Sequence, residues 1–302
     1  MRHERASQNR VETRRRTHHA RAPRGFAFFI SLTLACLANA GQTPARAAVT
    51  PQSELTPLQH EIQVQRARLS SLDVEERRDA VTRLGAMARP EGSRAAAAAL
   101  GDSAAIVRAT AAHAVVSLGA SEASTLILPL LKDRDEFVRR EAAYALGQTR
   151  SSVGVPALVA ALGADKQPSV RGAAAVALGQ IGDAQAVPAL IAALTRRLPA
   201  TGLLNRIRRR RVEEDEFVRR ASAISLGQIN SREAVPALIE TLSNERTPDD
   251  IRRESARALG VIGDPAAVPA LRAVLAARDP YLARIAFDAL RRINPQSAAS
   301  PG

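Results

Sequence analysis

The apolar positions of this chain recur in a phrase of ten residues. The phrase reads VRREAAYALG from Val138, VRGAAAVALG from Val170, VRRASAISLG from Val218 and IRRESARALG from Ile251. Counted from its first residue, offsets 0 and 8 are aliphatic and offset 4 is Ala or Ser, and these three offsets share one face of an α-helix. Each phrase therefore predicts an amphipathic helix with a small residue at the centre of its buried face, where a second helix can approach closely.

Seven copies of the phrase follow one another along the chain. They begin at Glu76, Val107, Val138, Val170, Val218, Ile251 and Leu282, and the step between them is 31 to 33 residues except for one step of 48. A period of this size is typical of helical units that bury their apolar faces against their neighbours. Gly follows offset 8 in five copies, and we predict that the first helix ends there in a left-handed cap.

A second helix is predicted after each phrase. The turn before it includes Gly182, which Asn230 replaces in a later copy, and both residue types tolerate a left-handed backbone. Asp and Ser are placed as N-caps, Pro stands early in the helix, and Leu recurs at offset 24. In the second copy Pro129 comes four residues later than the pattern, which predicts a kinked or displaced helix.

The composite phrase VRxxAAxALGxxGDxxAVPAL resembles the HEAT repeat, specifically its phycobilisome-lyase-like subtype, from about Asp73 to Ile293. The resemblance implies an all-α fold, a right-handed α-solenoid of about six HEAT-like helical hairpins plus terminal capping helices. We place the repeat domain at 73–294 with an insertion at 197–213. An N-terminal capping helix is predicted within 55–72, opened by a capping box at Thr56, and a disordered tail at 295–302.

The first 40 residues read as a bacterial secretory signal peptide. An Arg-rich stretch runs to Arg24, a short apolar run follows to Leu37, and small residues stand before Gly41. Residues 41–54 are then a flexible linker, and the repeats are expected in the periplasm or cell envelope. Two alternatives remain, an uncleaved membrane anchor with the repeats outside the cytoplasm and lipidation at Cys36, which is the single cysteine of the chain.

The residues that could carry chemistry are few. After the leader only His60 and His113 remain, and no nucleophile elbow or phosphate-binding Gly-rich loop occurs. We interpret His113 as a partly buried helix-face residue, and we predict no enzyme activity, no metal and no cofactor. The alternative is an enzyme of the phycobilin-lyase type or the diiron deoxyhypusine-hydroxylase type, both of which use similar repeats. The diiron type needs several His-Glu pairs, whereas His60-Glu61 is a single pair.

Arginine recurs one residue after the start of six phrases. The positions are Arg77, Arg108, Arg139, Arg171, Arg219 and Arg252. Such a column could bind an acidic ligand, but HEAT-like repeats commonly use an Asp and Arg ladder to tie units together. Asp73, Asp135 and Asp215 lie four residues earlier, and Asp102, Asp133 and Asp165 lie in the loops between units. We therefore predict a structural ladder, with Asp135 and Asp215 among its acids.

The 48-residue step contains the insertion, which we expect to be a surface loop. It carries a cationic cluster made of Arg206, Arg208, Arg209, Arg210 and Arg211, followed by the acidic run Glu213 to Glu216. The cluster is either paired with that acidic run or binds a partner, with an anionic membrane surface or nucleic acid as the alternatives. The net charge is +13, but residues 1–40 alone contain eight Arg and two Glu. Because we expect export, no nucleic acid partner is predicted.

These observations favour a protein-interaction scaffold that binds a protein partner along the solenoid surface. We expect the chain to be a monomer. The sequence contains no feature that identifies the partner.

Overall fold

The computed structural model describes residues 55–199 and 211–294. All described elements belong to one compact unit within Ser53–Gly302. The predicted signal peptide at 1–40, the linker at 41–54 and the tail at 295–302 lie outside the described residues. Within the described ranges, no helix combines the length and the apolar character needed to cross a bilayer.

The predicted hairpins are present as pairs of helices. The first helices are α2 (Val74–Ala86), α4 (Ala105–Ala114), α6 (Glu136–Thr149), α8 (Pro168–Ile181), α11 (Glu216–Ile229), α13 (Asp249–Ile262) and α15 (Pro280–Ile293). The second helices are α3 (Pro90–Ala96), α5 (Ala120–Ile127), α7 (Val155–Ala164), α9 (Val187–Thr195), α12 (Val235–Ser243) and α14 (Val268–Ala273). Short 3₁₀ turns lead into or extend the second helices. Over the described ranges this makes six hairpins, followed by α15 without a partner.

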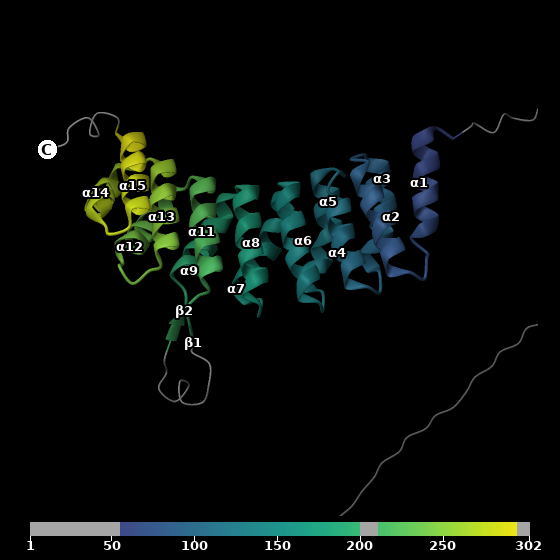
Figure 1. Cartoon of the computed structure of the whole chain (residues 1–302), viewed down its shortest axis with the longest axis horizontal. Helices are drawn as coiled ribbons and strands as arrows, with labels where there is room; N and C mark the ends of the chain where they lie inside the picture. Colours follow the sequence, from purple (N-terminus) through teal and green to yellow (C-terminus); the bar gives the residue numbers. More distant parts are fainter. Residues whose placement is uncertain (1–54, 200–210, 295–302) are drawn as a thin grey trace, which may run out of the picture. The chain divides into compact units, whose positions relative to one another are not determined.

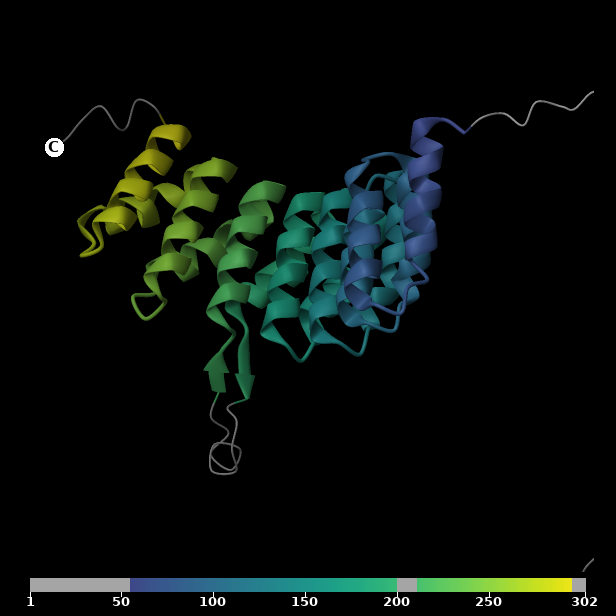
Figure 2. The same cartoon turned by 45° about the vertical axis from the view of Figure 1, so that its right-hand side comes forward.

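Consecutive first helices pack side by side, and the second helices form a parallel row behind or beside them (Figures 1 and 2). The apolar face predicted from the sequence is buried. Offsets 0, 4 and 8 are inaccessible or nearly so in every unit, except for Glu76, the first residue of the first unit, which is exposed. The fold is therefore the predicted all-α solenoid, and each unit buries its apolar face on its neighbours.

The helix starts follow local capping chemistry. Asp73, Asp135, Asp215 and Asp279 are the N-caps of α2, α6, α11 and α15, and each side chain accepts a hydrogen bond from a backbone N–H of the first turn. Helices α7, α9, α12 and α14 carry Pro in their first turn, as predicted. Left-handed caps end α6, α8, α11 and α13, at Arg150, Gly182, Asn230 and Gly263, with φ of 52°, 78°, 59° and 71°.

The terminal helix α1 (Pro57–Arg68) lies where a capping helix is expected. Its capping box is formed, because Thr56 Oγ1 accepts from the Gln59 N–H and Gln59 Oε1 accepts from the Thr56 N–H. Ile62 packs with Val81 and Leu84 of α2. Helix α1 thus covers the apolar end of the first hairpin.

The glycine after offset 8 does not end the first helix, so that prediction is wrong. Helices α6, α8, α11 and α13 continue for two residues beyond it. A Cβ on Gly260 would lie 2.7 Å from Ala289 Cα of the next first helix, and a Cβ on Gly147 would lie 2.8 Å from Ala177 Cα. The glycine column therefore lets consecutive first helices approach closely, which is a long-range requirement.

Replacing Gly260 with Ala should destabilise the protein. Alanine has the higher helix propensity, but its Cβ meets backbone atoms that cannot rotate away, and overpacking of this kind costs about 1–3 kcal/mol. Urea unfolding measures the change. The matched control is Gly163→Ala in α7, where a Cβ meets nothing within 4 Å, so the same substitution should stabilise by about 0.5–1 kcal/mol. Equal effects at both sites would contradict the packing role.

Helix α4 departs from the pattern of the other first helices. Val116 stands in the glycine position, and α4 ends at Ala114, two residues before it. The buried core also divides here, because Val107 and Ala111 pack with the N-terminal cluster whereas Ala109 and Ala112 pack with the larger C-terminal cluster.

Two further predictions concern the second helices, namely the effect of Pro129 and the Leu at offset 24. In the second unit α5 gives way to a 3₁₀ turn, Leu128–Lys132, that contains Pro129, as expected from its shifted position. The column of Leu at offset 24 is buried at Leu131, Leu162, Leu194 and Leu242, but Leu275 is 40% exposed. No further hairpin follows to cover the last leucine in the described residues.

The insertion begins and ends as a short antiparallel ribbon rather than as a plain loop. Strand β1 (Arg197–Pro199) pairs with β2 (Arg211–Glu213), with Arg197 opposite Glu213. Figure 2 shows the ribbon projecting from the row of helices between α9 and α11.

Candidate functional site

An arginine ladder links the first helices of successive units. Each of the first three rungs joins an arginine to the aspartate that ends the second helix of its own hairpin, just before the next first helix. The Nε–Oδ2 distances are 2.7 Å for Arg77–Asp102, 2.8 Å for Arg108–Asp133 and 2.7 Å for Arg139–Asp165, and each Nη2 donates to the other carboxylate oxygen. The bidentate geometry fixes the position of the loop.

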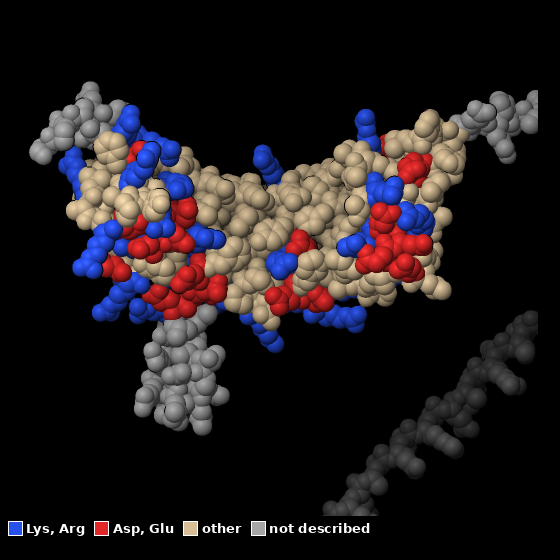
Figure 3. Space-filling model, in the orientation of Figure 1, with Lys and Arg blue, Asp and Glu red and all other residues tan. Residues whose placement is uncertain are grey.

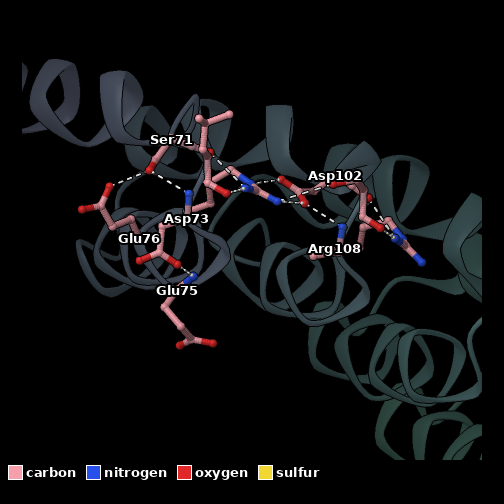
Figure 4. Close-up of polar contacts among 10 residues, drawn as sticks. Ser71, Asp73, Glu75, Glu76, Asp102 and Arg108 are labelled. Atoms are coloured by element: carbon pink, nitrogen blue, oxygen red, sulfur yellow. Dashed lines mark hydrogen bonds and ion pairs between the residues drawn. The ribbon is translucent and has the colours of Figure 1, made fainter.

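Each ladder aspartate also shapes its own turn. Asp102 Oδ1 accepts from the backbone N–H of Ala104 at 2.8 Å, and its carbonyl accepts from Arg108 Nη1 at 2.8 Å. Asp102 therefore contacts two successive arginines. Figure 4 shows Asp102 beside Arg108. The ladder ties each loop to the arginine of its own unit and to the arginine of the next.

The structure corrects the prediction for Asp135 and Asp215. Their carboxylates accept from the backbone N–H groups of Phe137 and Phe217, each at 2.9 Å, and so serve as N-caps. An N-cap side chain turns back over its own helix. The carboxylate that meets Arg139 is that of Asp165, in the loop after the hairpin.

The fourth rung passes through the insertion. Arg196 stands where the ladder aspartate is expected, and the carboxylate comes from Glu214, just after β2. Glu214 accepts from Arg171 Nη2 at 2.5 Å and Nε at 3.1 Å, and from Arg196 Nη1 at 3.5 Å. Its side chain is fully buried. The end of the insertion is thus built into the ladder.

The last two ladder arginines have no aspartate at the equivalent position. Asn244 ends α12, and Ala277 follows the last turn of the sixth hairpin. Arg219 and Arg252 instead donate Nε to the carbonyls of Leu194 and Leu242, at 2.9 and 3.0 Å.

Other residues replace the missing contacts around these two arginines. Arg219 Nη1 also pairs with Glu213. The link from α13 to α15 is made by the neighbouring Arg253, whose Nε lies 2.7 Å from Asp279 Oδ2.

The ladder lowers the pKa of its carboxylates. The hydrogen bond from Arg77 is the main reason that the pKa of Asp102 is low, and the hydrogen bond from Arg253 does the same for Asp279. Burial by itself raises the pKa of Asp133 and Asp165. The hydrogen bonds from their arginines and from backbone N–H groups, with the arginine charge, outweigh burial and leave both pKa values lowered.

We expect the protein to lose stability in acid. Because the pKa values of these four carboxyls are lower in the folded state, the unfolded chain binds more protons at low pH. Their contribution is complete above the ordinary carboxyl pKa of about 4 and is lost as the pH falls through the lowered folded-state values. Urea unfolding at pH 7 and at lower pH measures this dependence. In Asp133→Asn the dependence should be shallower, and an unchanged slope would contradict the contribution of this rung.

Most of the arginine cluster predicted to bind a partner lies outside the described residues. Arg206, Arg208, Arg209 and Arg210 lie outside the described residues, and for Arg211 the structure describes the backbone, which pairs with Pro199. The first two acids after the cluster contact other arginines. Glu213 pairs with Arg219 and lies 4.0 Å from Arg197, and Glu214 pairs with Arg171 and Arg196. Both glutamates therefore form ion pairs with arginines outside the cluster.

The two histidines in the described ranges lie on different helices. His113 of α4 is half-buried, and its Nε2 lies 3.0 Å from Glu141 Oε2 of α6, while His60 is exposed on α1. In the part of the chain that the structure describes, no group of three or more His, Cys, Asp or Glu side chains could hold a metal ion.

A groove between α11 and α13 was not predicted from the sequence. It encloses about 240 Å³ and is lined by Ile224, Gln228, Glu254, Arg257 and Val261, together with Gly227 and Ala258. Ile224 is 38% exposed and Val261 is 48% exposed. The sequence signal was Ile224 at offset 6, the offset of His113, which we interpreted as a partly buried helix-face residue.

Charge is distributed unevenly over the repeats. Figure 3 shows charged patches towards both ends of the array, a smaller one near α6, and a largely uncharged area over α8. Helix α8 has one charged residue, Arg171, and this residue is buried in the ladder. The exposed side of α8 therefore offers neutral side chains.

Solved structures with a similar fold include several repeat proteins. YibA of Escherichia coli is 21% identical with a TM-score of 0.53, over 78% of this chain and 81% of that one. The CpcE and CpcF complex of phycocyanin lyase from Nostoc sp. PCC7120 is 23% identical with a TM-score of 0.43, over 85% and 93%. Human deoxyhypusine hydroxylase is 21% identical with a TM-score of 0.38, over 78% and 96%. Likeness at this level extends to the fold alone.

The comparison with curated proteins returned no match. The family model described as HEAT repeats matches residues 62–147, 123–201 and 200–291, which is most of the chain. With the stacked hairpins and the arginine ladder, these matches show that the chain belongs to the HEAT repeat family.

Proposed function

We propose that this protein is a non-catalytic scaffold that binds a protein partner along the row of first helices, with the groove between α11 and α13 at the centre of the contact. The observation that carries the proposal is the exposure of Ile224 and Val261 on the two walls of one groove. Aliphatic side chains on a concave surface gain free energy when a partner covers them. The surrounding Gln228, Glu254 and Arg257 can orient that partner.

A column of glutamine side chains extends this surface. Gln148, Gln180 and Gln228 are exposed at the same offset of α6, α8 and α11. A Cβ on Gly147 or Gly179 would lie 2.3 Å from the amide oxygen of Gln180 or Gln228, so these amides lie against the preceding helix. An amide donates and accepts hydrogen bonds. The glutamine column therefore supports binding of an extended segment of the partner, whose backbone N–H and C=O groups could hydrogen-bond to these amides.

Differential capture tests the proposal. The full chain is immobilised and exposed to an extract of its native cells, in parallel with Ile224→Asp/Val261→Asp. The control is Val153→Asp, which places one carboxylate on another exposed aliphatic residue, 43% exposed, in the 3₁₀ turn before α7. A partner should bind the wild type and the control and be lost from the groove variant. Capture that is equal on all three proteins would contradict the role of the groove.

Catalysis is the competing explanation, and it has a direct test. Two of the similar structures are named as a lyase and a hydroxylase. Metal analysis and an absorbance spectrum of the purified protein distinguish the two functions. Stoichiometric iron or a bound pigment would contradict a non-catalytic scaffold.

The location that we propose is the periplasm or cell envelope, where the chain acts as a monomer. Support comes from the leader, in which Arg-rich, apolar and small-residue segments follow one another. Cell fractionation and sequencing of the mature N-terminus test this. A native protein that stays in the cytoplasm with residues 1–40 intact would contradict export.

A further inference from the structure

A cavity of about 370 Å³ lies beside the base of the β1–β2 ribbon, against α9, α11 and α12. The residues that matter for its chemistry are Arg197, Glu213, Arg219, Glu240, Asn244 and Thr247. None of them lines the groove between α11 and α13. The cavity lies at the fifth rung, where the ladder lacks its carboxylate.

Asn244 occupies the position of a ladder aspartate. It ends α12, and its Oδ1 accepts from the N–H of Arg246 at 3.0 Å. Asp133 and Asp165 end their hairpins in the same way, and their Oδ1 atoms accept from the N–H two residues on, each at 2.9 Å. The turn is thus preserved. The second carboxylate oxygen, which would accept from the arginine, is replaced by the amide NH2 group, which can only donate.

Two polar side chains beside Asn244 do not use all of their hydrogen-bonding groups. Arg219 is buried, and its described contacts use Nε and Nη1, to the Leu194 carbonyl and to Glu213. Thr247 is 2% exposed, and its Oγ1 is the one buried side-chain oxygen or nitrogen in the described ranges that lacks a hydrogen-bond partner. A buried polar group without a partner is unfavourable. A guanidinium has five N–H donors, so Arg219 can donate to a further acceptor in the cavity.

The charges around the cavity define the ligand. Arg197 and Arg219 come from the ribbon and α11, whereas Glu240 comes from α12 and is exposed. With Glu213 the formal charges balance. A ligand that carries only negative charge would meet two carboxylates. A group with a carboxylate for the arginines and an N–H donor for Glu240 matches both.

We propose that this cavity binds an α-carboxylate with an N–H donor on the adjacent carbon, the group shared by a free α-amino acid and the C-terminal residue of a peptide. The carboxylate replaces the missing ladder acid and accepts from Arg219, Arg197 and the Asn244 amide. The N–H donates to Glu240. The volume is at the lower end of the range for ligand sites, about 300–1,000 Å³, which suits one or two residues.

Calorimetric titration of the full chain tests the proposal with three probes. These are N-acetyl-Ala-Ala with a free carboxylate, the same dipeptide as its C-terminal amide, and free alanine. The free-carboxylate dipeptide, alanine or both should bind, while the amide should bind at least about tenfold more weakly, a difference well resolved in dissociation constants. Binding of the dipeptide alone identifies a peptide C-terminus as the source, and binding of alanine alone identifies a free amino acid.

Asn244→Asp provides the decisive variant. Its carboxylate should complete the rung with Arg219, raise the midpoint of thermal unfolding and abolish binding of the carboxylate probes. The matched control is Ser243→Asp, which adds the same charge at the neighbouring exposed residue outside the cavity lining and should bind as the wild type does. Glu240→Gln should weaken binding without a change in the unfolding midpoint. Absence of binding by the wild type at millimolar probe, or equal binding by the Asn244→Asp variant and its control, would overturn the proposal.

Discussion

Replacing Leu178 with Asp is expected to unfold the middle of the array. Leu178 is fully buried in α8, which packs against α6, α7 and α11. The substitution removes an aliphatic group from the core and leaves a carboxylate without a counter-charge, a combination that costs more than about 4 kcal/mol. Because each unit of a solenoid contacts only its neighbours, loss of α8 also separates the N-terminal hairpins from the C-terminal ones.

Hydrogen exchange and circular dichroism measure this result. Amide protection should be lost first in α6, α8 and α11, and the helical signal should fall at a lower temperature than in the wild type. Gln180→Asp is the control, because it adds the same charge two residues away at an exposed position of the same helix. If Leu178→Asp melts as the wild type does, the assignment of the buried helix face is wrong.

The second large effect is expected from Arg108→Met. This substitution leaves Asp133, whose side chain is 10% exposed, without its bidentate partner. Removing one member of a buried ion pair costs about 3–5 kcal/mol because the remaining charge is uncompensated. The double variant Arg108→Met/Asp133→Leu should recover part of that loss, since no buried charge then remains.

Urea unfolding of the single and double variants gives the coupling energy. The control is Arg94→Met, because Arg94 pairs with Glu122 across two units at 3.4 Å but both side chains are about half exposed, at 60% and 46%. Exposed pairs contribute about 1 kcal/mol or less, so this variant should change little. Similar losses for the Arg94 and Arg108 variants would show that burial does not set the strength of the rung.

Most of the fold could be predicted because its determinants are local. The spacing of Val170, Ala174 and Leu178 places them on one face of a helix whatever the neighbouring units do. Asp279 caps α15 through backbone N–H groups within three residues of it. Gly182 and Asn230 adopt left-handed conformations because of their own steric properties. Patterns of this kind can be interpreted without knowing what packs against them.

The errors concern contacts between units. Gly147 looked like a helix end, but it lies inside α6 because Ala177 of the next first helix approaches it. Asp135 and Asp165 both lie within one repeat length of Arg139 in the sequence. Only the packing of successive hairpins determines that Asp165 faces the guanidinium. The exposed groove at Ile224 was missed for the same reason, since burial at offset 6 depends on how far apart α11 and α13 lie.

The sequence by itself determined the repeat, the helices and their caps, and with these the solenoid class, because each depends on interactions within a few residues. The tertiary structure alone decided how the units meet: which acids complete the ladder, why glycine recurs inside the first helices, and where a rung is left open at Asn244. These properties arise between residues about 25 to 30 positions apart or, across the insertion, 43 apart. Residues so far apart in the sequence come into contact only when one hairpin packs on the next.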